Sequence, residues 1–168
     1  MIVFEYFNKY LKIPKDQIII YGRSIGSGPA IHLASLKKDI CALIVVSAFT
    51  SIKDVVKNQV GKILSIFIRN RFNNLKRISE IKAPCLLIHG EQDELIPVDH
   101  CKKLYQACKS KSVDKDIKLF HGMNHNDYDE KEHLLKPLKT FLKRVKNSKK
   151  TSIDIQLQRI SFKIDDDT

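Results

Sequence analysis

Long apolar runs and a secretion signal are both missing from this 168-residue sequence. No stretch approaches the ~18 consecutive apolar residues that a membrane-spanning helix requires. The first five residues carry neither a basic segment nor a small-residue cleavage site, so we expect an intracellular, cytoplasmic protein. A chain of 168 residues fits one domain with a substantial hydrophobic core.

Cysteine is scarce, and its spacing is not that of a metal site. The four cysteines lie far apart and lack the short Cys-x-x-Cys spacings of metal-binding motifs (Cys41, Cys85, Cys101 and Cys108). Two of them fall in apolar runs that are typical of strands. We therefore expect reduced, mostly packed thiols, and we expect neither a metal nor another cofactor.

Acidic residues are outnumbered, with 19 Asp and Glu against 30 Lys and Arg and a formal net charge of +11. A basic chain is a candidate for binding nucleic acid or an anionic membrane surface. However, 24 of the 30 basic residues are lysines, spread along the chain without interleaved aromatic residues. Nucleic acid is therefore not the expected partner, whereas peripheral membrane contact stays open.

Glycine is also scarce, which makes its one regular pattern informative. Two of the six glycines frame Ser24 in a Gly-x-Ser-x-Gly pattern at residues 22–26, which chance would produce about 0.015 times in this composition. An apolar run, 17–21, precedes the pattern, and a small-residue segment, 26–36, follows it. This is the strand–turn–helix context of a nucleophile elbow, whose two glycines make room for a strained serine. A glycine-rich turn without a catalytic role is the alternative.

Apolar runs alternate with amphipathic segments, which predicts an α/β fold with a parallel sheet. Four apolar runs are typical of strands in such a sheet (17–21, 41–46, 85–90 and 117–122). Four segments show helical patterns (2–12, 26–36, 97–109 and 127–146). We expect the first of these helices to present a stripe that includes Phe4, Phe7 and Tyr10.

Residues 53–77 interrupt this alternation. The segment contains seven basic residues and one acid, and an apolar stripe runs along it (Val56, Val60, Ile63, Leu64 and Phe67). We interpret it as a short helical lid insertion, whose stripe packs beside the site or whose basic face lies on a membrane interface. Residues 1–146 are then the expected domain. Residues 147–168 form a C-terminal extension, whose alternating apolar residues fit either a bulged strand or a mobile tail.

A catalytic serine needs a base within hydrogen-bonding reach and an acid that orients the base. Asp93 lies in the loop after the run 85–90, and His125 lies in the loop after 117–122. Loops at the carboxyl ends of parallel strands meet at one edge of the sheet. We therefore expect Ser24, His125 and Asp93 to come together at that edge.

Other residues could fill two of these roles. His89 and His121 follow strand runs and are alternative bases, although burial or local hydrogen bonding is their expected state. Glu91 or Glu94 could replace Asp93 as the orienting acid. The other histidines fall in helical patterns and two further aspartates at expected helix starts, where no catalytic role is expected (His32, His100, His133, Asp99 and Asp127).

Three short runs carry a family resemblance: residues 19–26, His89-Gly90-x-x-Asp93-x-x-x-Pro97 and Gly122-x-x-His125-Asn126-Asp127. Over residues 2–146 the chain resembles the α/β-hydrolase superfamily. The runs resemble a branch of intracellular serine hydrolases that includes membrane-associated protein depalmitoylases. The resemblance implies acyl transfer through Ser24, with His125 as base and Asp93 as orienting acid. It also implies that the Ile25 backbone N–H is one oxyanion donor.

The resemblance covers only the C-terminal portion of the superfamily's fold. A complete fold has several strands before the elbow strand, and a loop after one of them supplies the second oxyanion donor. Nothing in residues 1–17 matches these strands, so we expect the sequence to be part of a longer chain, weakly active or inactive by itself. The expected function is hydrolysis of acyl esters or thioesters, including fatty-acyl groups on protein cysteines. The alternative is a non-catalytic interaction domain on a hydrolase scaffold.

Overall fold

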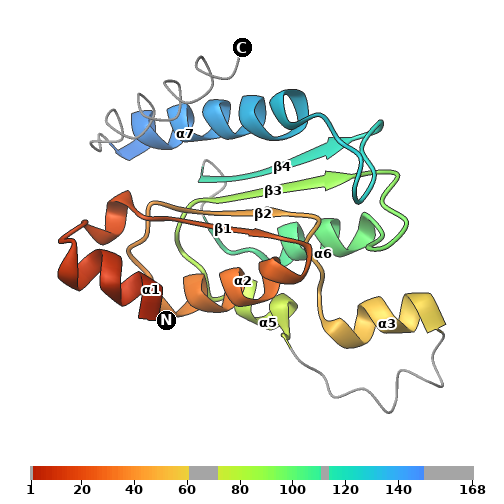
Figure 1. Cartoon of the computed structure of the whole chain (residues 1–168), viewed down its shortest axis with the longest axis horizontal. Coiled ribbons are helices and arrows are strands. Elements are labelled where there is room, and N and C mark those ends of the chain that lie inside the picture. Colours follow the sequence, from red (N-terminus) through yellow and green to blue (C-terminus); the bar gives the residue numbers. More distant parts are fainter. Residues whose placement is uncertain (1, 61–71, 111–113, 150–168) are drawn as a thin grey trace.

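A parallel sheet of four strands forms the centre of the computed structural model, which describes residues 2–60, 72–110 and 114–149. The strands lie side by side in chain order: β1 (Ile19–Arg23), β2 (Ala42–Val46), β3 (Cys85–Gly90) and β4 (Lys115–Phe120). All three neighbouring pairs are parallel. The strands point the same way, so their carboxyl ends share one edge of the sheet (Figure 1). The parallel α/β architecture predicted from the sequence is confirmed.

Helices cover both faces of this sheet. On one face lie α2 (Ser27–Leu36), α5 (Asn74–Ile78) and α6 (Asp99–Ala107), and on the other lies α7 (Lys136–Lys149). A π-helical segment, Glu130–Leu135, leads into α7. α3 (Ile52–Val60) follows the carboxyl end of β2, and α1 (Ile2–Glu5) continues as a π-helical turn, Tyr6–Tyr10. The result is three layers, with the sheet in the middle.

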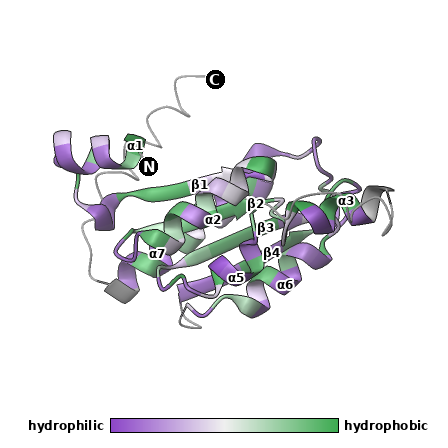
Figure 2. Ribbon diagram, turned by 90° about the horizontal axis from the view of Figure 1, so that it is seen from below, coloured by the Kyte–Doolittle hydropathy of each residue, from purple (hydrophilic) through white to green (hydrophobic). Residues whose placement is uncertain are grey.

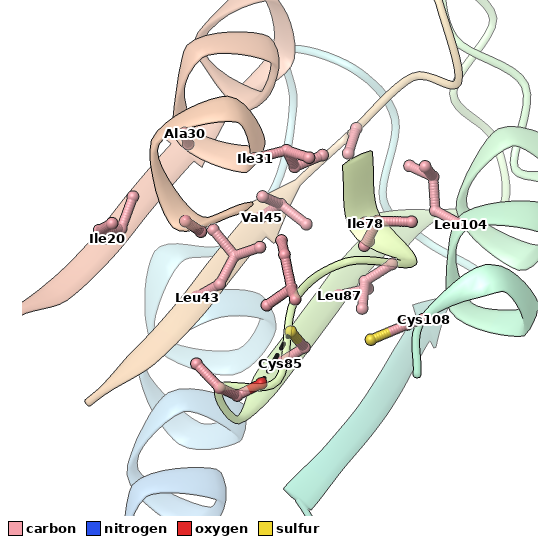
Figure 3. Close-up of a cluster of buried hydrophobic side chains, with 14 of the residues drawn as sticks. Ile20, Ala30, Ile31, Leu43, Val45, Ile78, Cys85, Leu87, Leu104 and Cys108 are labelled. Carbon is pink, nitrogen blue, oxygen red and sulfur yellow. Dashed lines mark hydrogen bonds between the residues drawn. The ribbon is translucent and has the colours of Figure 1, made fainter. Parts of the chain in front are cut away.

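The strand residues alternate between two hydrophobic clusters, one on each face. Leu43 and Leu87 belong to the cluster under α2, α5 and α6, drawn in Figure 3, whereas Ile44 and Ile88 pack against α7. Every residue of β2 and β3 is buried. Because both faces are covered, β2 is apolar along its whole length, and β3 is apolar from Cys85 to Ile88 before His89 and Gly90 end it. The hydropathy colours of Figure 2 show the hydrophobic character of the central strands. The four cysteines are buried thiols, as expected.

The first strand begins two residues later than its apolar run predicted. Lys15–Gln17 form a 3-10 turn, and β1 then extends to Arg23, immediately before the elbow serine. The register pairs Arg23 with Val46 on β2, and Val46 with Ile88 on β3. The carboxyl ends of β1 and β2 are therefore level, and β3 extends two residues further, to Gly90.

The stripe expected on the N-terminal helix is buried at only one of the three residues named above. Phe4 is 4% exposed, whereas Phe7 and Tyr10 are 41% and 76% exposed. The helix changes from α to π geometry after Glu5, so residues three and four positions apart no longer share one face. An ion pair of Glu5 with Lys37 ties this segment to the end of α2.

Of the insertion expected over 53–77, the structure describes α3 at its start and α5 near its end. Ile63, Leu64 and Phe67 lie outside the described residues, as does the segment 150–168. The lid, its membrane contact and the domain boundary at residue 146 therefore stay predictions. Among the helices of the described ranges, none is long and apolar enough to cross a membrane.

Candidate active site

Ser24 lies at the tip of a tight turn between β1 and α2. Its φ angle is +50°, in the left-handed region that is costly for any residue with a side chain. The 3-10 turn Ser24–Gly26 leads directly into α2, and the Ser27 hydroxyl donates a hydrogen bond to the Ser24 carbonyl oxygen (2.7 Å). The strained strand–turn–helix geometry expected from the sequence is therefore present.

The two glycines of the elbow have different roles. A Cβ atom on Gly22 would lie 2.5 Å from the Gly26 carbonyl oxygen and 2.6 Å from the Ala30 Cβ, so only glycine fits between the strand and α2. A Cβ atom on Gly26 would meet no heavy atom within 4 Å. The expectation that both glycines make room is correct for Gly22 and wrong for Gly26. It is the Gly26 carbonyl oxygen that approaches Gly22.

His125 and Asp93 lie next to Ser24 in space. Ser24 Oγ is 2.9 Å from His125 Nε2, although the two residues are 101 positions apart in the sequence. His125 Nδ1 is 2.8 Å from Asp93 Oδ2. Asp93 is 5% exposed and His125 is 9% exposed, so both groups are largely shielded from water. The structure thus brings together the three side chains singled out in the sequence, in the order hydroxyl, imidazole, carboxylate.

The loop after β3 holds the Asp93 carboxylate in place. Asp93 Oδ1 accepts hydrogen bonds from the backbone N–H groups of Leu95 (3.1 Å) and Ile96 (2.8 Å). Its other oxygen, Oδ2, faces His125. Because a carboxylate only accepts hydrogen bonds, we assign the imidazole proton to Nδ1, which leaves the Nε2 lone pair facing the Ser24 hydroxyl. In this tautomer His125 can accept a proton from Ser24.

His89 lies beneath the same loop and is fully buried. Its Nε2 is 2.7 Å from the Ile96 carbonyl oxygen, to which it donates, and 3.5 Å from Asp93 Oδ2. Burial lowers the pKa of His89 and favours its neutral form. His89 therefore supports the acid loop, whereas His125 contacts Ser24.

The other candidates for the base and the orienting acid do not take part in the contact between Ser24 and the His125 imidazole. The His121 side chain is 86% exposed with Nδ1 3.4 Å from Glu91 Oε2, so of the two expected states, burial or a local polar contact, it has the local contact. Glu91 and Glu94 are exposed, and the buried carboxylate of Asp93 faces the imidazole instead. Asp127 lies in the loop after β4 rather than at a helix start.

A cavity of about 790 Å³ opens beside the imidazole, between the loop 91–95 and the loop 124–127. Small-molecule sites commonly have volumes of about 300–1,000 Å³. A Cβ atom on Gly90 would lie 2.0 Å from the Met123 carbonyl oxygen, so glycine is required where the two loops diverge. No cluster of three or more His, Cys, Asp or Glu side chains in the described part of the chain could hold a metal ion.

Arg23 was missed by the sequence reasoning, which treated it as a variable position of the elbow motif. Its Nη2 donates a hydrogen bond to the backbone carbonyl of His125. Its guanidinium carbon lies 5.1 Å from the centroid of the Tyr128 ring. A long basic side chain directly before the serine was the available signal, but local sequence does not show where such a side chain reaches.

Comparison with known proteins relates the chain to one superfamily. Residues 73–132 match the family model described as serine aminopeptidase, S33. The chain is 35% identical over 128 residues to protein bem46 of Schizosaccharomyces pombe, covering 73% of this chain and 42% of that protein. It is 32% identical over 130 residues to human alpha/beta hydrolase domain-containing protein 17B, covering 77% and 43%. The chain therefore spans less than half the length of these relatives.

A solved structure shares the fold at low sequence identity. The acetyl xylan esterase from Paenibacillus sp. R4 matches with a TM-score of 0.67 and 19% identity, covering 84% of this chain and 49% of that one. At this identity the likeness concerns the fold alone. The parallel sheet, the strained serine elbow and the named relatives all agree. The chain has the parallel-sheet core of the α/β-hydrolase fold, and over part of their length it is similar in sequence to proteins of that superfamily.

Proposed function

We propose that this protein is a serine hydrolase of acyl esters or thioesters. The observation that carries the proposal is the 2.9 Å distance from Ser24 Oγ to His125 Nε2, with Asp93 Oδ2 2.8 Å from His125 Nδ1. A serine hydroxyl is a weak nucleophile until an adjacent base, itself oriented by a third group, activates it. Sequence similarity to a human protein named alpha/beta hydrolase domain-containing protein 17B supports the same reaction class.

The reaction consists of acylation and deacylation. Ser24 Oγ attacks the acyl carbonyl carbon while His125 Nε2 takes the hydroxyl proton, and the carbonyl electrons move to oxygen. The tetrahedral oxyanion then expels the leaving oxygen or sulfur, which receives the proton from His125. Water attacks the acyl-Ser24 ester with His125 again as base, which releases the carboxylic acid and restores the serine.

The backbone N–H of Ile25 is the proposed donor to the oxyanion. Ile25 directly follows the nucleophile, in the 3-10 turn that opens α2. The first N–H groups of a helix lack partners inside the helix, and the helix dipole favours negative charge near them. One such donor contributes about 2.7–4 kcal/mol to transition-state stabilisation.

Fatty-acyl groups on protein cysteines are the proposed substrates within this class. The support is the resemblance of residues 19–26 and 122–127 to the depalmitoylase branch. A thioester offers the same electrophilic carbonyl to Ser24 as an ester does. Peripheral membrane contact through residues 53–77 would bring the site close to acylated proteins at a membrane surface.

Labelling with a fluorophosphonate tests the proposal, because this probe phosphonylates an activated serine. We expect one adduct on Ser24, located by peptide mass spectrometry, and its loss in Ser24→Ala. Excess probe and long incubation allow even a slow nucleophile to accumulate adduct. Ser35→Ala is the matched control, since the Ser35 hydroxyl donates to the His32 carbonyl (2.8 Å) within α2. A folded protein that takes up no probe would favour a non-catalytic interaction domain. Labelling that persists in Ser24→Ala would show that Ser24 is not the reactive residue.

A further inference from the structure

Arg23 joins the strand of the nucleophile to the loop of the base. It is the last residue of β1, directly before Ser24, and pairing with Val46 on β2 fixes its backbone. From this position Nη2 donates a hydrogen bond to the backbone carbonyl of His125. The contact joins residues 102 positions apart, so it links two elements that the chain itself does not connect closely.

Tyr128 provides the second contact of the guanidinium. The Arg23 Cζ atom lies 5.1 Å from the Tyr128 ring centroid, within the range of a cation–π interaction. Tyr128 and His125 belong to the same loop, so both contacts tie Arg23 to one segment. The Arg23 side chain is half-buried with its Nε fully buried, and charged hydrogen bonds are stronger where water is partly excluded.

The loop that carries His125 lacks regular structure, and its start is held by buried Met123, whose carbonyl accepts from the Gln92 N–H (3.3 Å). The Asn124 side chain accepts hydrogen bonds from the backbone N–H groups of Asn126 (3.0 Å) and Asp127 (2.7 Å). These bonds shape the loop internally but do not tie it to the elbow. A displacement of about 1 Å would take the imidazole out of hydrogen-bonding distance of Ser24.

We propose that Arg23 is a positioning residue that holds His125 against Ser24. The nucleophile and the residue that holds its base are then neighbours on one strand, so a movement of the elbow carries both. Arginine suits the role because a planar guanidinium can donate within its plane while its face lies over an aromatic ring. A lysine ammonium lacks this planar geometry. The inference rests on the proposed function, in which His125 is the base.

Turnover of a short-chain thioester by Arg23→Met, Arg23→Lys and Arg144→Met tests the inference. Arg144 is the matched control on α7: its Cζ lies 5.4 Å from the Phe141 ring centroid and its Nη1 3.2 Å from Asp116 Oδ2. We expect kcat to fall about 10–100-fold in Arg23→Met with a smaller change in KM, because the base is misplaced while the loop 91–95 on the other side of the cavity is untouched. Arg23→Lys should fall in between, and Arg144→Met should match wild type. Equal kcat in Arg23→Met and Arg144→Met would overturn the inference.

Proton NMR of the imidazole supplies a readout that needs no substrate. The Nδ1–H proton between His125 and Asp93 gives a low-field signal when the imidazole is held in place. We expect this signal in wild type and Arg144→Met, and its broadening or loss in Arg23→Met. A sharp, unshifted signal in Arg23→Met would contradict the positioning role. Loss of the signal in Arg23→Met, together with probe labelling that survives Ser24→Ala, would instead contradict the proposed function.

Tyr128 gives a second test for the case in which Arg23→Met does not fold. Tyr128→Leu removes the aromatic face over which the guanidinium lies, and Tyr128→Phe keeps it. We expect a lower kcat and a broadened low-field signal in Tyr128→Leu relative to Tyr128→Phe. The same kcat and the same signal in both variants would overturn the role of the stacked arginine.

Discussion

Ser24 Oγ lies 2.9 Å from His125 Nε2, at a serine whose φ angle is +50°. The strained turn points the hydroxyl away from the strand and toward the loop after β4. The short distance therefore depends on the elbow and the loop together, and variants of either should disturb it.

In a longer chain that contains the complete fold, Asp93→Asn should leave the fold intact and lower kcat by about 10⁴-fold. The asparagine oxygen can still accept from the Ile96 N–H, but its NH₂ group then faces His125 and favours the wrong imidazole tautomer. Steady-state kinetics measure the loss, and thermal unfolding checks the fold. Asp99→Asn, at an exposed position on α6, is the control. A loss of less than about tenfold in Asp93→Asn would contradict the orienting role.

Gly22→Ala should lower the free energy of unfolding by about 1–3 kcal/mol. The new methyl group would overlap the Gly26 carbonyl oxygen and the Ala30 side chain, and backbone atoms cannot rotate away. Gly26→Ala is the matched control, since its φ and ψ angles of −66° and −19° suit alanine and its Cβ meets open space. Urea denaturation measures both variants. Equal stability of the two variants would show that close packing at Gly22 is unimportant.

The free energy of unfolding should fall as pH drops below about 6.5. Burial lowers the pKa values of His89 and His100 below the ordinary value of 6.5. Just below pH 6.5 the unfolded chain therefore binds protons at these residues while the folded chain does not, and stability decreases toward acid. Each histidine can contribute a slope of up to about 1.4 kcal/mol per pH unit.

Urea denaturation at pH 7.5 and 5.5 measures this slope. His100→Asn should reduce it, because one of the two imidazoles whose pKa burial lowers is removed. His121→Gln should leave it unchanged, since the His121 side chain is 86% exposed. A wild-type stability that is the same at both pH values would contradict the prediction.

Vesicles that contain anionic lipid should bind the protein, and added salt should weaken that binding. The basic insertion begins with α3, where Lys53 is half-buried and Lys57 is exposed. Replacing both with glutamate should reduce vesicle binding in a sedimentation assay. The same replacement of Lys139 and Lys143, exposed on α7, is the charge-matched control. Equal binding to neutral and anionic vesicles would contradict a role for the basic face.

The sequence by itself determined the sheet and the elbow, because both follow from local physical requirements. Strands buried on both faces must be apolar along their length, so β2 and β3 were readable as runs. Gly22 is required by the close approach of α2, which made the elbow motif visible. Parallel strands place their following loops at one edge, so Ser24, Asp93 and His125 could be expected to meet.

Only the tertiary structure decided which of the competing residues meet, because those contacts join residues about 100 positions apart. His125 rather than His89 reaches Ser24, since His89 turns under the loop to the Ile96 carbonyl. Phe7 is 41% exposed because the first helix changes to π geometry, which its hydrophobic periodicity did not reveal. The bond from Arg23 to the His125 carbonyl depends on the loop's path in space, and no local pattern encodes that path.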